Sequence, residues 1–200
     1  MAKEWIGNLP NKGNFPRKRG KWEELDERLV YNNPWIKVTE SNVINPNGGK
    51  GIYGVVDFKN LAIGIIPLDE NNHTWIVGQE RFPFYGKYTW EIIEGGGPVD
   101  KDPLESAKKE LSEEAGLAAN RWDKIQKMDL SNSATTEKAI IYVARELSEH
   151  QSPQDDTELL ELKKISFEEL YMRVINGEIT DSLSVAGVLK LKILINEGSI

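Results

Sequence analysis

The hydrophobic and polar positions of the first hundred residues predict β-strands. Two runs that alternate or are apolar, "NPWIKVTESNVI" at 33–44 and "GKGIYGVVDF" at 49–58, flank the turn signal "NPNGG", which is the pattern of a β-hairpin. The apolar run "NLAIGIIPL" at 60–68 indicates a buried strand, and "TWIVGQERF" at 74–82 is its expected partner across the turn "DENNH". The first half of the chain is therefore expected to be rich in β-structure.

Helix signals begin after residue 100. Asp102 suits the N-cap of a helix of about thirteen residues, and Gly116 suits the left-handed position that ends it. The runs 138–146 and 158–166 read as strands, Ser166 begins a capping signal for a helix ending near residue 177, and 183–196 reads as a closing helix. Without a regular βαβ repeat, these elements favour an α+β fold, an α/β/α sandwich with a mixed sheet, preceded by an N-terminal antiparallel β-hairpin or sheet.

Composition limits the size of the core, the kinds of partner and the kinds of metal ligand. The 200 residues, 39% of them hydrophobic, suffice for one main core with a small appended element. We expect a flexible basic arm at 1–21, a β-element at 22–58 and the main domain at 59–200. The formal charge of −7 argues against nucleic acid or anionic lipid as the main partner. With no cysteine and two histidines, a bound metal must be held by oxygen.

The sequence shows no signal for export or membrane insertion. The amino terminus "MAKEWIGNLP" lacks an apolar signal core. No later segment approaches the roughly 20 apolar residues of a membrane span. We therefore expect a soluble cytoplasmic protein.

Carboxylates gather on one edge of the helix after residue 102. In "KKELSEEAG" at 108–116, Glu110, Glu113 and Glu114 lie within about 100° of arc, beside the apolar stripe of the helix. One interpretation is a solvated face on which Lys109 pairs with Glu105 or Glu113. The other is a site for a hard divalent cation, because carboxylates one turn apart offer oxygen ligands to one ion or to adjacent ions. The spacing alone supports both equally.

Three glycines, Gly95, Gly96 and Gly97, precede this helix. Glycine can take a positive φ and allows the backbone to come close to a ligand. A loop with free N–H groups that leads into a helix N-terminus favours anions. The glycines therefore favour a phosphate and metal site over a solvated face.

Residues 95–117 resemble the Nudix box, G-x5-E-x7-R-E-U-x-E-E-x-G-U, in which U is aliphatic. The matching positions are Gly95, Glu110, Leu111, Glu113, Glu114, Gly116 and Leu117. Two positions depart, because Lys101 stands where the family has its first glutamate and Lys109 stands where it has arginine. Lysine keeps the charge of arginine but lacks the planar fork that holds a carboxylate.

The resemblance covers roughly residues 22–195 and extends to the ADP-ribose and nucleotide-sugar pyrophosphatase branch of the family. "VGQERFPF" is similar to a strand that places an arginine, here Arg81, near the substrate phosphates. "TWEIIEGGG" is similar to a Glu-Leu-Pro-Ala-Gly segment, in which the backbone carbonyl at the position of Glu94 helps to bind metal. In that branch an N-terminal sheet mediates a swapped homodimer, so the resemblance implies a homodimer formed through residues 22–58 and a Nudix domain at 59–200.

The resemblance implies an enzyme that hydrolyses a nucleoside diphosphate derivative, such as ADP-ribose or a nucleotide sugar, to a nucleoside monophosphate and a sugar phosphate. The cofactor would be Mg²⁺, or alternatively Mn²⁺, which lowers the pKa of an attacking water. The implied metal ligands are Glu94, Glu110, Glu113 and Glu114. The implied substrate-binding residues are Arg81, Gly95, Gly96 and Gly97.

A general base must also reach the attacking water. In the branch this base is often an acidic residue on a loop after the box, and here "SPQDDTELLE" supplies Asp155, Asp156 and Glu158. Spacing from the next strand favours Glu158, with Asp156 as the second candidate, and Glu113 completes the expected catalytic set.

Two alternatives stay open from the sequence. Hydrolysis of nucleoside triphosphates or capped RNA is encouraged by the basic arm at 12–21, but the front hairpin argues against it because small triphosphate members usually lack one. A non-catalytic nucleotide-sugar sensor on the same fold is suggested by Lys101 in place of the first glutamate.

Overall fold

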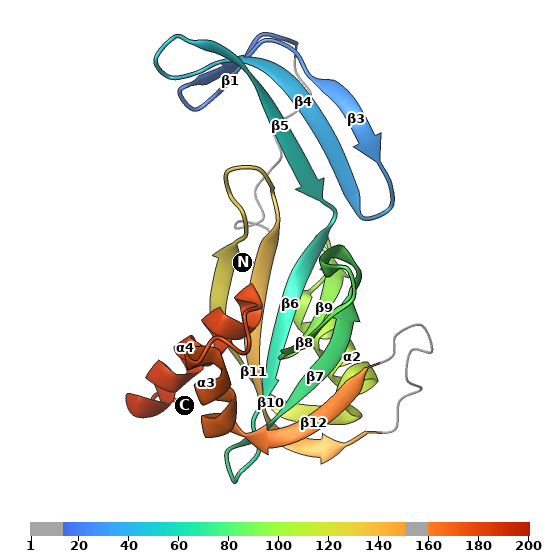
Figure 1. The fold of residues 1–200 in the computed structure, drawn as a ribbon, viewed down its shortest axis with the longest axis vertical. Helices are drawn as coiled ribbons and strands as arrows, with labels where there is room; N and C mark the ends of the chain where they lie inside the picture. Colours follow the sequence, from blue (N-terminus) through green and yellow to red (C-terminus); the bar gives the residue numbers. More distant parts are fainter. Residues whose placement is uncertain (1–13, 151–159) are drawn as a thin grey trace. The chain divides into compact units, whose positions relative to one another are not determined.

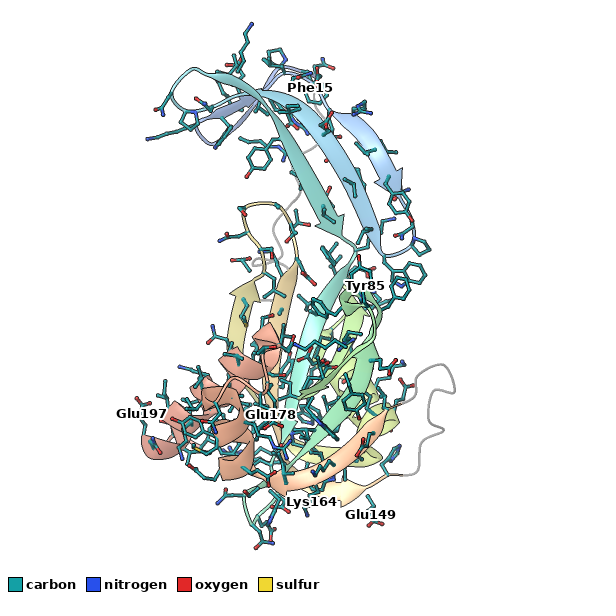
Figure 2. All side chains as sticks on the ribbon, in the orientation of Figure 1. Phe15, Tyr85, Glu149, Lys164, Glu178 and Glu197 are labelled. Carbon is teal, nitrogen blue, oxygen red and sulfur yellow. The ribbon has the colours of Figure 1, made fainter. Side chains whose placement is uncertain are left out.

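The computed structural model describes residues 14–150 and 160–200, and these form two compact units whose elements can be followed in Figure 1. The first unit contains the described residues up to 61 together with 98–100 and 129–138. The second unit contains residues 62–97, 101–128 and 139–200.

The first unit is built on an antiparallel sheet with the strand order β1-β2-β4-β3, in which β5 also pairs with β4. Its strands are β1 (Arg17–Arg19), β2 (Trp22–Glu24), β3 (Arg28–Asn32), β4 (Ile36–Ile44) and β5 (Lys50–Phe58). The main-chain N–H of Asn45 donates to the carbonyl of Gly49 at 2.8 Å, and Gly48 has a φ of +86°. Glycine adopts that φ without strain, so "NPNGG" closes the predicted β4–β5 hairpin.

A buried carboxylate joins the basic run at 17–19 to this sheet. Glu24 is 2% exposed, accepts a hydrogen bond from the Ser41 hydroxyl at 2.6 Å, and forms ion pairs with Arg17 and Arg19. Burial alone would raise the pKa of Glu24, but the hydrogen bonds from Arg17 and Ser41 outweigh it and lower that pKa. Residues 17–19, which the sequence places in an extended arm, form strand β1, and Glu24 holds the guanidinium groups of Arg17 and Arg19.

The second unit contains two sheets, with the strand orders β10-β11-β6-β9 and β12-β7-β8. The strands are β6 (Asn60–Pro67), β7 (His73–Arg81), β8 (Lys87–Glu91), β9 (Ile93–Pro98), β10 (Leu117–Asp129), β11 (Lys138–Glu149) and β12 (Glu161–Ser166). A short 3₁₀ helix, η1 (Phe82–Phe84), links β7 to β8.

The predicted pairing of residues 60–68 with 74–82 is wrong. The turn between them forms, since the main-chain N–H of Asp69 donates to the carbonyl of His73 at 3.0 Å. However, β6 pairs in parallel with β11, whereas β7 pairs with β8 and β12 in the other sheet. The apolar run of β6 is buried on both faces, which is typical of a parallel pair. The sequence pattern predicts this burial but does not specify the partner strand.

Both faces of β6 are covered by helices, which Figure 1 shows around the β6–β11 sheet. A Cβ built at Gly187 of α4 (Ser182–Asn196) would lie 3.2 Å from Ile66 Cδ1, so α4 packs against the even-numbered face. A Cβ built at Gly97 would lie 3.4 Å from Ile63 Cδ1 and 2.2 Å from Ser106 Oγ of α2 (Pro103–Ala115). The odd-numbered face therefore carries α2, because successive side chains of a strand point to opposite faces, while β9 is the neighbour of β6 in the same sheet.

The helices begin and end where the sequence predicts. The Asp102 carboxylate accepts the N–H of Leu104 at 3.0 Å, and Gly116 ends α2 with a φ of +63°. The Ser166 hydroxyl caps α3 (Phe167–Ile175) by accepting the N–H of Glu169 at 3.1 Å. Together with the mixed sheets, these helices confirm the predicted α+β class. In the part of the chain that the structure describes, no helix combines the length and apolar character needed to cross a membrane.

Candidate active site

The glycine run lies directly under the carboxylate edge of α2. Gly95, Gly96 and Gly97 belong to strand β9, and none of them has a positive φ. The freedom of glycine to take a positive φ is therefore not used here, and the run lies in a strand. The glycines serve close approach instead, because a Cβ at Gly95 would lie 2.2 Å from Cδ of Glu110. Only a residue without a side chain allows Glu110 to pack on β9 in this way.

The three acids of α2 lie on one partly buried edge. Glu110, Glu113 and Glu114 are all half-buried, and Oε2 of Glu114 is shielded from solvent. Lys109 donates to Glu113 at 2.6 Å, which confirms the predicted pair four residues apart. The edge therefore combines one exposed ion pair with two acids that lie closer to the strand.

The residue types on this edge suit a hard divalent cation, because such ions take oxygen ligands from carboxylates and backbone carbonyls. The contact between Gly95 and Glu110 places a main-chain segment of β9 beside a carboxylate. Within residues 14–150 and 160–200, no three acidic or histidine side chains are already gathered around a common point. A metal bound here would thus require the side chains of Glu110, Glu113 and Glu114 to turn towards one point.

Arg81 lies at the end of β7 and is held by an acid that sequence reasoning missed. Its Nε donates to Oε2 of Glu91 at 3.2 Å, and its Nη2 donates to Oε1 of the same carboxylate. Gln79 donates to that Oε1 at 2.7 Å. Burial raises the pKa of Glu91, while the charge of Arg81 and the hydrogen bonds from Arg81 and Gln79 oppose this rise. The spacing of Gln79 and Arg81, two residues apart on one strand face, is the signal that could have suggested a shared partner.

Glu94 contacts the N-terminus of α4 through its side chain. The Ser184 hydroxyl donates to Oε1 of Glu94 at 3.2 Å and accepts the N–H of Ile92 at 3.0 Å. Burial raises the pKa of Glu94 well above its usual value, and the hydrogen bond to Asp181 adds to the rise. Burial would also raise the pKa of Asp181, but the hydrogen bonds from Glu94 and from Ser184 lower it. The hydrogen bond between the side chains of Glu94 and Asp181, the N-cap of α4, thus raises the pKa of one carboxyl and lowers the pKa of the other.

The two acids proposed as general base, Asp156 and Glu158, lie outside the described residues, as does Asp155. Asn132 and Ser133 line a hollow of about 260 Å³ in the first unit. Trp22 and Tyr53 form another wall of this hollow, with their rings in an edge-to-face contact at 5.3 Å. Sequence reasoning assigned no role to this aromatic pair, since its two members are far apart in the chain.

Comparison with known families gives the identity of the fold and site. The family model described as NUDIX domain matches residues 58–183. The chain belongs to the Nudix family. A second model, described as the nucleoside diphosphate sugar hydrolase N-terminal domain, matches residues 22–56. This Nudix chain is therefore a pyrophosphohydrolase of nucleoside diphosphate derivatives, and enzymes of its family use divalent metal ions.

Individual relatives agree with this assignment. The Nudix chain is 29% identical over 171 residues to an ADP-ribose pyrophosphatase of Mycobacterium tuberculosis, which covers 84% of this chain and 82% of the relative. It is 26% identical over 166 residues to a methanol dehydrogenase activator of Bacillus methanolicus, covering 82% of this chain and 89% of the relative. A solved structure of an ADP compounds hydrolase superposes with a TM-score of 0.79 at 19% identity, over 92% of this chain and all of that one. This last likeness shows the shared fold.

Proposed function

We propose that this Nudix enzyme hydrolyses the diphosphate linkage of ADP-ribose or a nucleotide sugar in the presence of Mg²⁺, with Mn²⁺ as an alternative ion. Water adds to one phosphorus and the bridging P–O bond breaks, so the products are a nucleoside monophosphate and a sugar phosphate. The observation that carries the proposal is the contact of Glu110 with Gly95, which holds the carboxylate edge of α2 against β9. The names of the two ADP-related proteins similar to this chain support the substrate class.

The acids of α2 would hold the metal. Glu110, Glu113 and Glu114 would supply carboxylate oxygens, and Glu94 would add its main-chain carbonyl. The bound ion would offset the charge of the diphosphate and lower the pKa of the attacking water. The side chain of Glu94 is engaged by the Ser184 hydroxyl of α4. This arrangement suits a carbonyl ligand rather than a carboxylate ligand at that position.

The substrate would be oriented by Arg81 and by the main chain of Gly95, Gly96 and Gly97. The side chain of Arg81 is 36% exposed, so it can meet a diphosphate without leaving Glu91. Arginine suits this task because its planar fork binds phosphate oxygens in pairs. Asp156 and Glu158 are the proposed proton acceptors for the attacking water.

We also propose that the enzyme forms a homodimer through its N-terminal sheet. In the described residues, β3 pairs with β4 alone and forms an edge of the sheet. Leu29, Val30 and Tyr31 of β3 are each more than half exposed. An exposed apolar edge strand is a template for pairing with another chain. Light scattering after size exclusion should give twice the mass of one chain, and a monomeric mass at all concentrations would refute this part.

Turnover on a substrate panel tests the hydrolase. The protein is incubated with Mg²⁺ and, in turn, ADP-ribose, ADP-glucose, GDP-mannose and a dinucleotide, and the release of nucleoside monophosphate is measured by chromatography. We expect release from at least one of these, and its loss by about 10²-fold or more in Glu114→Gln, since a metal ligand is removed. Folded protein without turnover on any member would refute the proposal.

The matched control is Glu105→Gln on the same helix. Glu105 is exposed and pairs with Lys108 at 2.8 Å on another face of α2. Its neutralisation removes one negative charge from the helix and leaves the acid edge intact. Near-normal turnover in this variant, with the loss in Glu114→Gln, would assign the effect to the acid edge rather than to the net charge of α2.

A further inference from the structure

Arg81 is clamped by a buried carboxylate. Glu91 is 2% exposed, and both of its oxygens accept hydrogen bonds from Arg81, Oε2 from Nε at 3.2 Å and Oε1 from Nη2. This is the two-point geometry that fixes the plane of a guanidinium group. Because Nε and Nη2 face Glu91, the edge that carries Nη1 points away from the carboxylate. The Arg81 side chain is 36% exposed, so part of it remains open to solvent.

The carboxylate of Glu91 is itself fixed. Glu91 of β8 pairs with Val77 of β7, and Gln79 and Arg81 follow on the same face of β7 at intervals of two residues. The Gln79 amide donates to Oε1 at 2.7 Å, so that oxygen receives hydrogen bonds from two different side chains. The hydrogen-bonded group of Gln79, Arg81 and Glu91 therefore spans two neighbouring antiparallel strands, and its geometry follows from their register.

The three side chains depend on one another. A carboxylate with so little exposure is costly unless it is paired and hydrogen-bonded. Arg81 and Gln79 provide this pairing, and Glu91 in return restricts a long side chain that would otherwise move among many rotamers. Glu91 does not reach the solvent-exposed edge of the guanidinium, so it acts through Arg81 and not on a ligand.

We infer that Glu91 is a positioning residue that fixes the guanidinium of Arg81 in the orientation that binds the substrate diphosphate. The inference deepens the proposed function and rests on it for the identity of the ligand. Fixing Arg81 before the substrate arrives removes the loss of side-chain freedom from the binding step. The effect belongs to substrate binding, so KM should respond and kcat should change little.

Electrostatic repulsion alone predicts the opposite change in KM for Glu91→Gln. Glu91 places a negative charge close to Arg81, and therefore close to a bound diphosphate. If that charge acted only at a distance, the substitution Glu91→Gln would remove a repulsion and lower KM. If Glu91 positions Arg81, the same substitution raises KM although the repulsion is gone. The direction of the change in KM thus separates the two roles.

The experiment compares Glu91→Gln with Glu80→Gln, Arg81→Lys and the double variant Arg81→Lys/Glu91→Gln. Glu80 is exposed and adjacent to Arg81 in the chain, but its side chain points to the other face of β7. Arg81→Lys keeps the charge and removes the fork that Glu91 orients. Steady-state kinetics are measured on the panel substrate that the wild type hydrolyses. Binding of α,β-methylene-ADP with Mg²⁺ is measured by calorimetry, because this diphosphate analogue needs no turnover.

We expect Glu91→Gln to raise KM and the calorimetric Kd about 10-fold, as for the loss of one charge-assisted hydrogen bond, with kcat within about threefold of the wild type. Glu80→Gln should stay within about twofold of the wild type in both constants. In the Arg81→Lys background, Glu91→Gln should change KM by less than about twofold, since no fork is left to position. If Glu91→Gln does not fold, Gln79→Ala should raise KM in the same direction by a smaller factor.

An unchanged or lower KM in folded Glu91→Gln would overturn the inference and leave the proposed function intact. A full 10-fold effect of Glu91→Gln in the Arg81→Lys background would also overturn it, because Glu91 would then act by another route. Absence of wild-type turnover, with analogue binding weakened in Glu91→Gln but not in Glu80→Gln, would refute the proposed function and support the positioning role. A wild type that neither hydrolyses nor binds would overturn both.

Discussion

Alanine at position 95 should displace Glu110, a proposed metal ligand. A Cβ at this position would lie 2.2 Å from Cδ and 2.3 Å from Cγ of Glu110. Non-bonded carbon atoms settle at about 3.5 Å or more, so Glu110 and the adjoining turn of α2 must move by roughly 1.3 Å. The backbone of Gly95 itself tolerates alanine, since its φ lies outside the left-handed region. The clash with Glu110 therefore accounts for the whole effect.

A shift of this size affects both catalysis and stability. Misplacement of a catalytic group by about 1 Å can cost on the order of 10²-fold in rate, so we expect kcat/KM of Gly95→Ala to fall by about that factor. The Mg²⁺ concentration for half-maximal activity should rise as well, because a carboxylate ligand is moved. Overpacking of this kind lowers the free energy of unfolding by about 1–3 kcal/mol, which thermal unfolding followed by circular dichroism will show.

Gly97→Ala is the matched control. Its Cβ would lie 2.2 Å from Ser106 Oγ and 2.7 Å from Ser106 Cβ, so it pushes on α2 from the same strand. Ser106 is not an acid and belongs to the first turns of the helix. We expect a similar loss of stability in this variant, but less than about a tenfold loss of kcat/KM and little change in the Mg²⁺ requirement.

The reasoning fails if folded Gly95→Ala keeps the kcat/KM of the wild type, since Glu110 would then not depend on its contact with β9. It also fails if Gly97→Ala loses as much activity as Gly95→Ala. In that case the position of α2 as a whole, and not the placement of Glu110, would control the rate. Both variants are assayed at a temperature at which unfolding curves show them to be folded.

Three other predictions concern pH, a loop and the metal. The folded-state pKa of Glu24 is lowered, so its stabilising effect is present at neutral pH and is lost as pH falls through that value. Glu24→Gln should lose about 1–3 kcal/mol of unfolding free energy at pH 7. Urea titrations should show that the difference in unfolding free energy between this variant and the wild type disappears in acid. Tyr53→Phe removes the hydrogen bond from its hydroxyl to the carbonyl of Ser133 at 2.6 Å and should cost about 0.5–1.5 kcal/mol, with faster amide exchange at Ala134; unchanged exchange would show that this bond does not hold the loop. Chelation with excess EDTA should abolish turnover, and Mg²⁺ or Mn²⁺ should restore it, whereas Ca²⁺ alone restoring full activity would contradict the proposed metal preference.

The helix that carries the acids could be predicted from the sequence almost residue by residue. Asp102 and Gly116 mark its ends through short-range chemistry, a side-chain cap and a left-handed glycine, which need no distant partner. The edge formed by Glu110, Glu113 and Glu114 follows from helical geometry alone. The family resemblance likewise depends on a continuous stretch of residues.

The partners of the strands could not be predicted in the same way. Residues 60–68 and 74–82 both read as strands and both form strands, but they belong to different sheets. Hydrophobic periodicity reports which face is buried, and many apolar strands satisfy that requirement equally well. The pairing of β6 with β11 depends on how the strands pack between α2 on one face and α4 on the other. Both helices lie far from β6 in the sequence.

The glycine run and the contact of Arg81 with Glu91 show the same difference between local features and contacts between distant residues. The residue types along the chain are enough to predict that Gly95, Gly96 and Gly97 permit a close approach, and that Arg81 follows Gln79 on one strand face. That Glu110 makes the close approach and that Glu91 is the partner of Arg81 follows from the folded arrangement of β8, β9 and α2. Local chemistry depends on neighbours within a few residues and can be read along the chain. Contacts across strands and between strand and helix depend on register and packing, which exist only once the whole domain has folded.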